Sequence, residues 1–263
     1  MKRNLLIALF LIWASSLFAL EQPKFSTAGF YELPNTGREV YSMNLAWRFY
    51  KGDVVGTPFA TGFDDSGWEV ISIPHGLEYL PIEASGCANY QGVAWYRKRF
   101  TLDSRLKGKQ LFIHFEAIMG KSEVYVNGKL LKKQYGGYLP VILDVTNELD
   151  WDGENVIAVK ADNSDDPSYP VGKPQNLLDF TYFGGIYRDC WLVAHNKVFI
   201  TNANYENEVA GGGLFVSFAD VSEKSAIVNL KAHVRNLSEK NERVTVTFNL
   251  KNKSGEVVKQ VFK

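Results

Sequence analysis

Residues 123–131 read Glu-Val-Tyr-Val-Asn-Gly-Lys-Leu-Leu, two short runs of strand-forming residues joined by Asn127-Gly128. A two-residue type I′ turn needs a positive φ at both central positions, and asparagine followed by glycine satisfies this requirement best. An Asn-Gly pair between alternating apolar residues is therefore the strongest short-range signal of a β-hairpin. We predict an antiparallel pair of strands here, and with it a fold built from short strands.

The same alternation extends to both sides of this hairpin. Upstream, residues 111–115 place Leu, Ile and Phe on one face of a run and Phe and His on the other. Downstream, residues 228–234 and 243–250 alternate in the same way. No stretch shows the 3.6-residue period of an amphipathic helix. The sequence therefore predicts an all-β protein, an antiparallel sandwich or jelly roll.

The domain organisation follows from a change in composition near residues 196–204, which precedes three consecutive glycines at 211–213. We predict a jelly-roll domain over residues 20–196 and a second β domain over residues 197–263. About four candidate strands follow Lys197, whereas an immunoglobulin-like sandwich has about seven. We therefore expect an incomplete immunoglobulin-like sandwich, either in a fragment of a longer polypeptide or in a chain that another chain completes.

The first residues have the layout of a signal peptide. Lys2 and Arg3 precede an apolar run over residues 5–13, and small residues follow up to Ala19. We predict that residues 1–19 are removed by cleavage after Ala19, and that the mature protein is periplasmic or secreted. The alternative is an uncleaved anchor, which the short apolar run disfavours because about 20 residues are needed to span a bilayer.

Charge and cysteine content narrow the choice of partners. The 29 basic and 29 acidic residues balance, and no basic run provides the positive surface that a nucleic acid requires. Four isolated histidines and two cysteines show no metal-binding spacing, so we predict no metal and no cofactor. Cys87 and Cys190 can form a single disulfide, but the strand-like surroundings of Cys190 favour a buried free thiol.

The segment from Asp162 to Tyr187 is the first candidate for a functional site. It contains three prolines and three glycines and shows no regular period. Loops longer than about 12–15 residues are uncommon in compact domains and are often functional. Its tyrosines, phenylalanines and aspartates can stack on a sugar ring and bind its hydroxyl groups. The alternative is an aromatic plug that packs one end of the sandwich.

Four blocks, taken together, resemble the N-terminal region of glycoside hydrolase family 2, the family of β-galactosidases, β-glucuronidases and β-mannosidases. The blocks are residues 68–75 (WEVISIPH), 93–100 (VAWYRKRF), 124–146 (VYVNGKLLKKQYGGYLPVILDVT) and 179–189 (DFTYFGGIYRD). The resemblance is strong over about residues 40–200. It implies a galactose-binding-like jelly roll, then an immunoglobulin-like domain, then a (β/α)₈ barrel that carries two catalytic glutamates.

The resemblance also implies that residues 1–263 hold no catalytic dyad, because in the family both glutamates lie in the barrel. Whether the isolated chain is an enzyme is left open. Two adjacent carboxylate pairs within the chain are candidate substitutes, Asp64-Asp65 and Asp165-Asp166. Each lies beside serine, glycine or proline, so we expect solvated turn residues at both places.

One residue role can be carried over from the family. Asp179 occupies the position of an aspartate that reaches from the jelly roll into the barrel's pocket and contacts sugar hydroxyls. An ionised carboxylate forms strong charge-assisted hydrogen bonds, although capping of loop amides is the alternative role. Asn163 and His75, from neighbouring loops, are weaker substrate-binding candidates, each with a structural role as the alternative.

Three functions remain open. The favoured one is the N-terminal portion of an exported, β-galactosidase-like family 2 glycosidase that acts in carbohydrate metabolism. It would supply sugar binding and the rim of the active site, with a β-galactoside or related glycoside as its partner. The others are a free-standing carbohydrate-binding protein and a structural module that binds another polypeptide.

Overall fold

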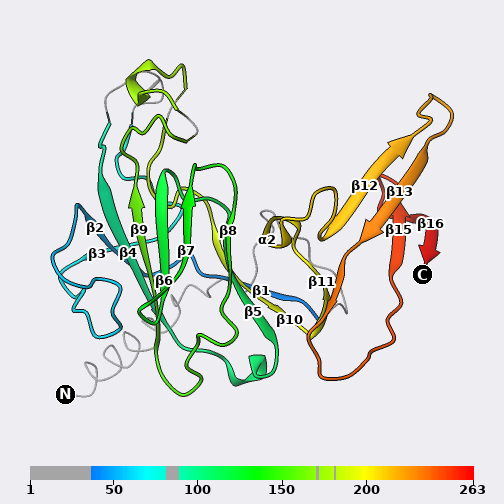
Figure 1. Cartoon of the computed structure of the whole chain (residues 1–263), viewed down its shortest axis with the longest axis horizontal. Helices are drawn as coiled ribbons and strands as arrows, with labels where there is room; N and C mark the ends of the chain where they lie inside the picture. The colour runs from blue at the N-terminus through cyan, green and yellow to red at the C-terminus, as the bar shows by residue number, and fades with distance from the viewer. Residues whose placement is uncertain (1–36, 81–88, 170–171, 181) are drawn as a thin grey trace, which may run out of the picture.

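The structure is a computed structural model that describes residues 37–80, 89–169, 172–180 and 182–263 (Figure 1). The predicted signal peptide, residues 1–19, and Cys87 lie outside these ranges. Nearly all regular structure in the described ranges is β-strand, and all pairings between the named strands are antiparallel. The prediction of an all-β fold is confirmed.

The first part of the chain forms a sandwich of two sheets. One sheet has six strands, in the order β3 (Glu69–Ile71), β2 (Trp47–Lys51), β4 (Val93–Phe100), β9 (Asn155–Asp162), β6 (Lys121–Val126) and β7 (Lys129–Tyr135). The other has four strands, in the order β1 (Glu39–Ser42), β10 (Cys190–His195), β5 (Gln110–Phe115) and β8 (Val141–Asp144). Strands distant in sequence lie side by side, as expected for a jelly roll.

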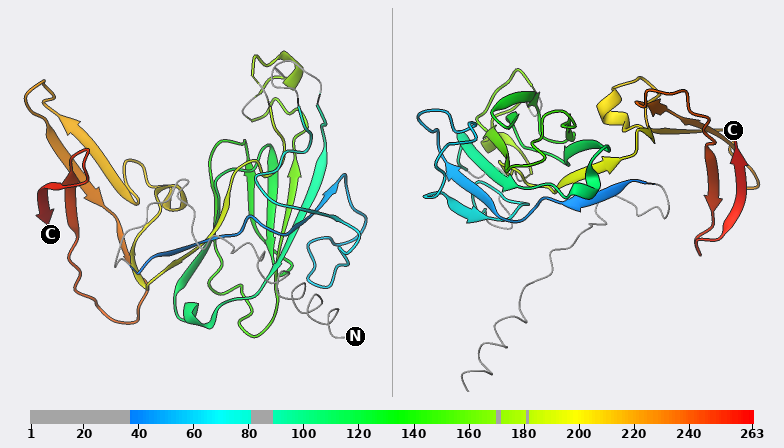
Figure 2. Two further views of the ribbon diagram at one scale, coloured as in Figure 1. Left: turned by 180° about the vertical axis from the view of Figure 1, so that it is seen from behind. Right: turned by 90° about the horizontal axis from the view of Figure 1, so that it is seen from below.

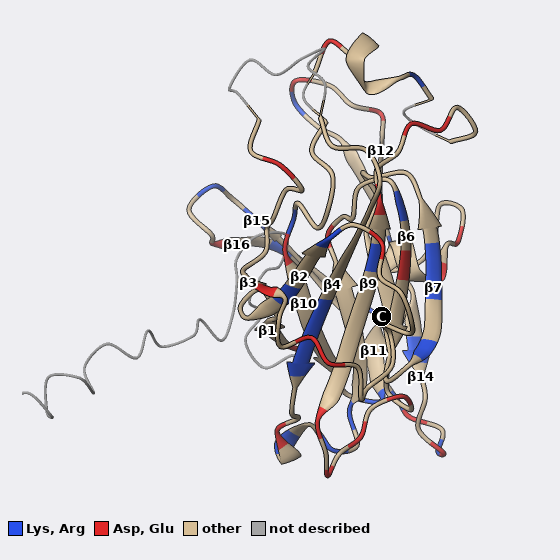
Figure 3. Cartoon of the chain, turned by 90° about the vertical axis from the view of Figure 1, so that its left-hand side faces the viewer, with Lys and Arg blue, Asp and Glu red and all other residues tan. Residues whose placement is uncertain are grey.

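The core lies between these two sheets. In β5, Leu111, Ile113 and Phe115 are buried in it, as the period-two pattern requires. Trp47 of β2 reaches across the core, and its ring centroid lies 6.0 Å from that of Phe115. Lys, Arg, Asp and Glu residues are interspersed along the strands of the six-stranded sheet (Figure 3).

The predicted hairpin is present between β6 and β7. Asn127 has a φ of 48° and Gly128 a φ of 85°, so both central residues are left-handed. The Asn127 side chain adds hydrogen bonds to the Glu148 carbonyl and to Asn155 Oδ1, each 2.8 Å long. The turn is thus fixed both by its backbone and by its contact with the chain that leads into β9.

The second part contains three separate two-stranded sheets (Figure 2). They pair β11 (Val198–Ile200) with β14 (Val234–Asn236), β12 (Leu214–Ala219) with β13 (Ile227–Ala232), and β15 (Thr247–Lys251) with β16 (Val257–Phe262). The sequence predicted about four strands here. The structure has six. The strands β11 and β14 were missed because each is only three residues long, too short to show an alternating pattern. Apolar side chains such as Phe218 and Phe262 are exposed in this part.

Helical structure in the described ranges is minimal. It consists of the helix α2 (Ala203–Glu206) and two 3₁₀ turns, η1 (Ser104–Leu106) and η2 (Gln175–Leu177). Asn202 caps α2 by accepting hydrogen bonds from two backbone amides of its first turn. In the part of the chain that is described, no helix has the length and apolar character needed to cross a membrane.

Candidate functional site

The long connection between β9 and β10 begins at Asn163, whose side chain is buried. Its Oδ1 accepts a hydrogen bond from the Gly92 amide (3.1 Å), and its Nδ2 donates to the Tyr90 carbonyl (2.6 Å). Its own carbonyl accepts a hydrogen bond from Gln175 Nε2. Asn163 therefore ties the start of the loop to the chain that precedes β4 and to η2.

The loop returns to the sandwich at Gly184-Gly185. Gly185 has a φ of 94°, and a Cβ atom there would overlap the Tyr96 hydroxyl and lie 2.9 Å from the His75 carbonyl oxygen. The Gly185 carbonyl accepts a hydrogen bond from the Met119 amide (2.9 Å). Because the backbone is left-handed and the space is filled, only glycine fits at this position.

His75 lies on the other side of this turn. Its Nδ1 is 3.1 Å from the Tyr96 hydroxyl, and its amide donates to the Ile186 carbonyl (2.8 Å). A hydrogen bond therefore joins the ring to the Tyr96 hydroxyl through Nδ1 and leaves Nε2 without a part in this bond. Burial lowers the pKa of His75, which keeps the ring neutral near pH 7.

Asp179 is presented in a different way. It is exposed and follows Leu178, which is buried against Met119 and Tyr182. No hydrogen bond or ion pair joins its carboxylate to another described residue. Asn163 and His75 thus meet at the Gly184-Gly185 turn, whereas no contact between described residues joins Asp179 to either of them.

The aromatic residues of the loop divide between packing and exposure. Tyr182 is buried, and the Tyr187 hydroxyl donates to the Gly137 carbonyl (2.6 Å). Phe180 and Phe183, by contrast, are 42% and 40% exposed. Tyr182 and Tyr187 therefore pack as the predicted aromatic plug. Phe180 and Phe183 instead remain partly exposed to solvent.

One expectation about the carboxylate pairs is wrong. Asp65 is buried, and its Oδ2 lies 2.7 Å from Arg97 Nε, because residues 57–68 fold over the six-stranded sheet and enclose it. Asp165 and Asp166 do act as loop residues, since they accept hydrogen bonds from the amides of Gln175 and Ser168. The alternation pattern gave no signal for the buried Arg97.

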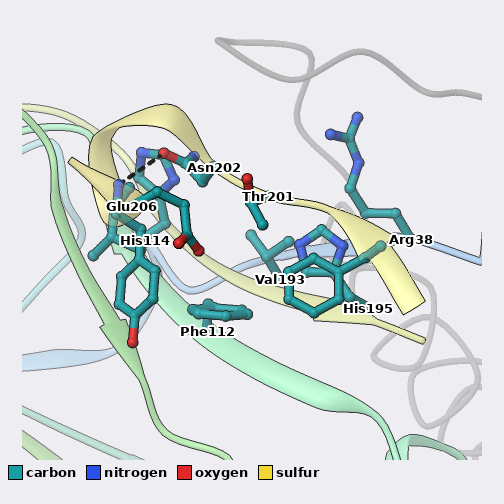
Figure 4. A pocket seen from close by; sticks show the side chains of 11 residues that line it. Arg38, Phe112, His114, Val193, His195, Thr201, Asn202 and Glu206 are labelled. Atoms are coloured by element: carbon teal, nitrogen blue, oxygen red, sulfur yellow. Dashed lines mark hydrogen bonds between the residues drawn. The ribbon is translucent and has the colours of Figure 1, made fainter. Parts of the chain in front are cut away.

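A small hollow of about 60 Å³ lies where the two parts of the chain meet (Figure 4). The Phe112 ring packs against Phe199 and Tyr205, with centroids 6.0 and 5.1 Å apart, and His195 stacks on Phe199 at 4.8 Å. Burial, with a smaller effect from nearby Arg38, lowers the pKa of His195 to about 4. These contacts make the hollow a packed seam between the two parts.

The side chain types that bind metals are not gathered around Cys190 or elsewhere in the described ranges. Cys190 is a buried free thiol whose pKa is raised by burial. Within the described ranges, no three or more His, Cys, Asp or Glu side chains are grouped so that they can hold a metal ion.

These features define a class of protein: a β-sandwich module whose long β9–β10 loop is anchored at both ends and carries an exposed carboxylate. A family model described as "Glycosyl hydrolases family 2, sugar binding domain" matches residues 61–196. The chain belongs to this family. The resemblance drawn from the four sequence blocks is thereby confirmed.

Similar curated proteins are glycosidases. The β-galactosidase of Thermoanaerobacter pseudethanolicus is 36% identical over 171 residues, which make up 64% of this chain and 22% of that protein. The β-galactosidase BoGH2A of Bacteroides ovatus is 34% identical over 229 residues, 84% of this chain and 25% of that protein. The chain thus spans about a quarter of the length of these relatives.

Solved structures show the same relationship. A β-glucuronidase from glycoside hydrolase family 2 matches with a TM-score of 0.75 and 28% identity, covering 89% of this chain and 25% of that one. β-Glucuronidase 2 of Bacteroides uniformis, covalently bound to cyclophellitol-6-carboxylate aziridine, matches with a TM-score of 0.70 and 30% identity, covering 86% and 26%. The fold of the described residues is therefore that of enzymes in this family.

Proposed function

We propose that this chain supplies the sugar-binding domain and part of the active-site rim of a family 2 exo-glycosidase. Hydrolysis is assigned to a catalytic barrel outside residues 1–263, with two carboxylates about 5–5.5 Å apart, as retaining glycosidases require. The proposed substrate is a β-galactoside, in keeping with the names of the two relatives described above.

The observation that carries this proposal is the presentation of Asp179. The loop is anchored at its two ends by Asn163 and Gly184-Gly185 and next to Asp179 by the buried Leu178, while Asp179 itself remains exposed. Because the buried Leu178 anchors the backbone next to Asp179, the loop loses less conformational freedom when the carboxylate binds a sugar hydroxyl. The hydrogen bond is charge-assisted and strengthens once the barrel excludes water from the site.

The exposed ring of Phe180 supports the same role. It follows Asp179 directly and offers an apolar surface beside the carboxylate. Sugar rings present C–H groups on their faces and hydroxyls at their edges, so an aromatic ring next to a carboxylate matches both. In this proposal Asp179 orients the sugar, and the glutamates of the barrel break the glycosidic bond.

Export is part of the proposal. Lys2 and Arg3, the apolar run and Ala19 support cleavage after residue 19 and delivery to the periplasm or the medium. Cell fractionation followed by N-terminal sequencing tests this point. A mature N-terminus at Leu20 in the exported fraction supports it, and an uncleaved cytoplasmic protein contradicts it.

The proposal is tested in the polypeptide encoded by the complete gene, with Asp179→Asn as the variant. Loss of a charged hydrogen bond to the sugar should lower kcat/KM by roughly 10- to 100-fold. Asp152→Asn is the matched control, because Asp152 is an exposed aspartate in the connection between β8 and β9. Equal activity of the Asp179→Asn variant and the control overturns the role of Asp179.

A further inference from the structure

A groove runs along the β3 edge of the six-stranded sheet, and Asp179 does not line it. Its volume is about 350 Å³, and its walls come from β2, β3 and the segment 75–79. Small-molecule sites usually occupy roughly 300–1,000 Å³ and combine aromatic surface with a few fixed polar groups. Figure 3 shows β2 and β3 at this edge of the sheet.

The aromatic wall of the groove is Tyr50. Its ring is 43% exposed and rests against Trp68, with centroids 5.6 Å apart and planes inclined by 35°. Trp68 is nearly buried and supports the tyrosine ring, which stays partly exposed where it lines the groove. An exposed ring face supported in this way favours contact with a flat, partly apolar ligand.

The polar wall is the ion pair of Lys51 and Glu78. Lys51 Nζ lies 2.9 Å from Glu78 Oε1, and both side chains remain about one-third exposed. Glu78 Oε2 accepts a hydrogen bond from the Tyr90 amide (2.7 Å), and Lys51 Nζ lies 4.7 Å from the centre of the Tyr90 ring. Both charged groups are therefore fixed before a ligand arrives, which reduces the entropy cost of binding.

His75 completes the set of polar groups. Since Tyr96 engages Nδ1, Nε2 is left to exchange a hydrogen bond with a hydroxyl group, and the neutral ring adds no charge to the groove. The charged lining residues are Lys51 with one positive charge and Glu69 and Glu78 with one negative charge each, so their sum is 1 − 2 = −1. Such a lining repels a ligand carboxylate and accepts hydroxyl groups.

We propose that this groove is a second saccharide site, which binds a neutral sugar ring and discriminates against uronic acids. The ring stacks on Tyr50, donates a hydroxyl hydrogen bond to Glu78 and exchanges another with His75 Nε2. The proposal depends neither on Asp179 nor on a catalytic barrel, because every group that it uses lies within the sandwich. Such a site would hold a neutral part of a glycan close to the enzyme while another part is hydrolysed.

The test is an NMR titration of residues 20–263, the chain without the predicted signal peptide. The probes are the methyl β-glycosides of galactose, glucose and mannose, with methyl β-glucuronide as the charged comparison. We expect at least one neutral glycoside to bind, and the glucuronide to bind more weakly. Tyr50→Ala should weaken binding about tenfold through lost apolar contact. Glu78→Gln should have a similar effect through the lost charged hydrogen bond.

Matched controls lie near the opposite edge of the same sheet, on β6 and β7. Tyr135→Ala removes an exposed tyrosine of β7, and Glu123→Gln breaks a similar pair, with Lys133. Neither control should change binding, and thermal unfolding of each variant shows that the fold is kept. The proposal is overturned if no neutral glycoside binds, if the glucuronide binds as tightly, or if Tyr50→Ala and Tyr135→Ala have equal effects.

Asp179→Asn separates this inference from the proposed function. If the groove holds the sugar, this variant binds the neutral glycoside as the unchanged chain does. If Asp179→Asn abolishes binding, the sugar is held by the loop instead. That result overturns the second site while leaving the proposed role of Asp179 intact.

Discussion

Arg97 and Asp65 form a buried ion pair on the outer face of the six-stranded sheet, with 2.7 Å between Nε and Oδ2. Arg97 also donates a hydrogen bond to the Ala60 carbonyl (3.1 Å). A single guanidinium therefore fastens residues 57–68 to β4, and these residues lead directly into β3 and His75. The pair positions the groove and one side of the Gly184-Gly185 turn.

Removing one partner of this pair should be costly. Asp65→Ala leaves the buried guanidinium without its counter-charge, so we expect a loss of about 3–5 kcal/mol in the free energy of unfolding, measured by urea titration. The control is Asp64→Ala, because Asp64 is exposed and accepts a hydrogen bond from the Ser66 amide at the surface. Its cost should be about 1 kcal/mol or less. Equal costs for the two variants would contradict the role assigned to the ion pair.

Gly185→Ala tests the close packing of the turn below the loop. Alanine at a positive φ costs about 1–2 kcal/mol by itself, and at Gly185 the added methyl group also meets Tyr96 and His75. Gly108→Ala is matched, because Gly108 has a φ of 81° with open space around its Cβ position. Thermal unfolding should show a clearly larger decrease in Tm for Gly185→Ala. Similar decreases would mean that the turn relaxes around the methyl group.

His195 makes stability depend on pH. Its pKa is about 4 in the folded chain, below the ordinary value of 6.5, so between these pH values the unfolded chain binds more protons. The contribution of His195 to stability is therefore complete above pH 6.5 and is lost as pH falls toward 4. We expect His195→Phe, which keeps a ring against Phe199, to lose less stability between pH 7 and pH 4.5. Urea titrations at both pH values measure this, and identical pH dependence in the two proteins rejects it.

Cys190 should be unreactive in the folded protein. Its thiol is buried, and burial raises its pKa, so little reactive thiolate is accessible. Iodoacetamide should label Cys190 only after denaturation without reducing agent, as judged by peptide mass spectrometry. Labelling in the native state contradicts the buried position. Failure to label after denaturation indicates a disulfide instead of a free thiol.

The fold class was accessible from sequence because strand patterns are local. Asn127-Gly128 predicts its own turn, and the alternation in residues 111–115 predicts which side chains enter the core. The short strands β11 and β14 escaped detection because three residues give too few positions to reveal a period.

The site was less predictable, because it depends on contacts between residues far apart in the chain. Nothing local distinguishes Asp65, which is enclosed by the fold, from exposed Asp64. Nothing local shows that Asn163 is buried either, because its hydrogen-bond partners Tyr90 and Gly92 lie more than seventy positions away in the sequence. The groove beside Tyr50 likewise forms only when β2, β3 and the segment 75–79 come together. Asp179 could be selected only through the family resemblance.

The most direct test of the account is to isolate the native protein from its own cells with an antibody to the sandwich. Its intact mass and its hydrolysis of aryl β-galactosides and β-glucuronides are then measured together. We predict a product heavier than the 29.6 kDa of this sequence by the mass of a barrel domain, with β-galactosidase activity. A single product at or slightly below 29.6 kDa without hydrolysis of either substrate would contradict the proposal that this chain works as part of a glycosidase.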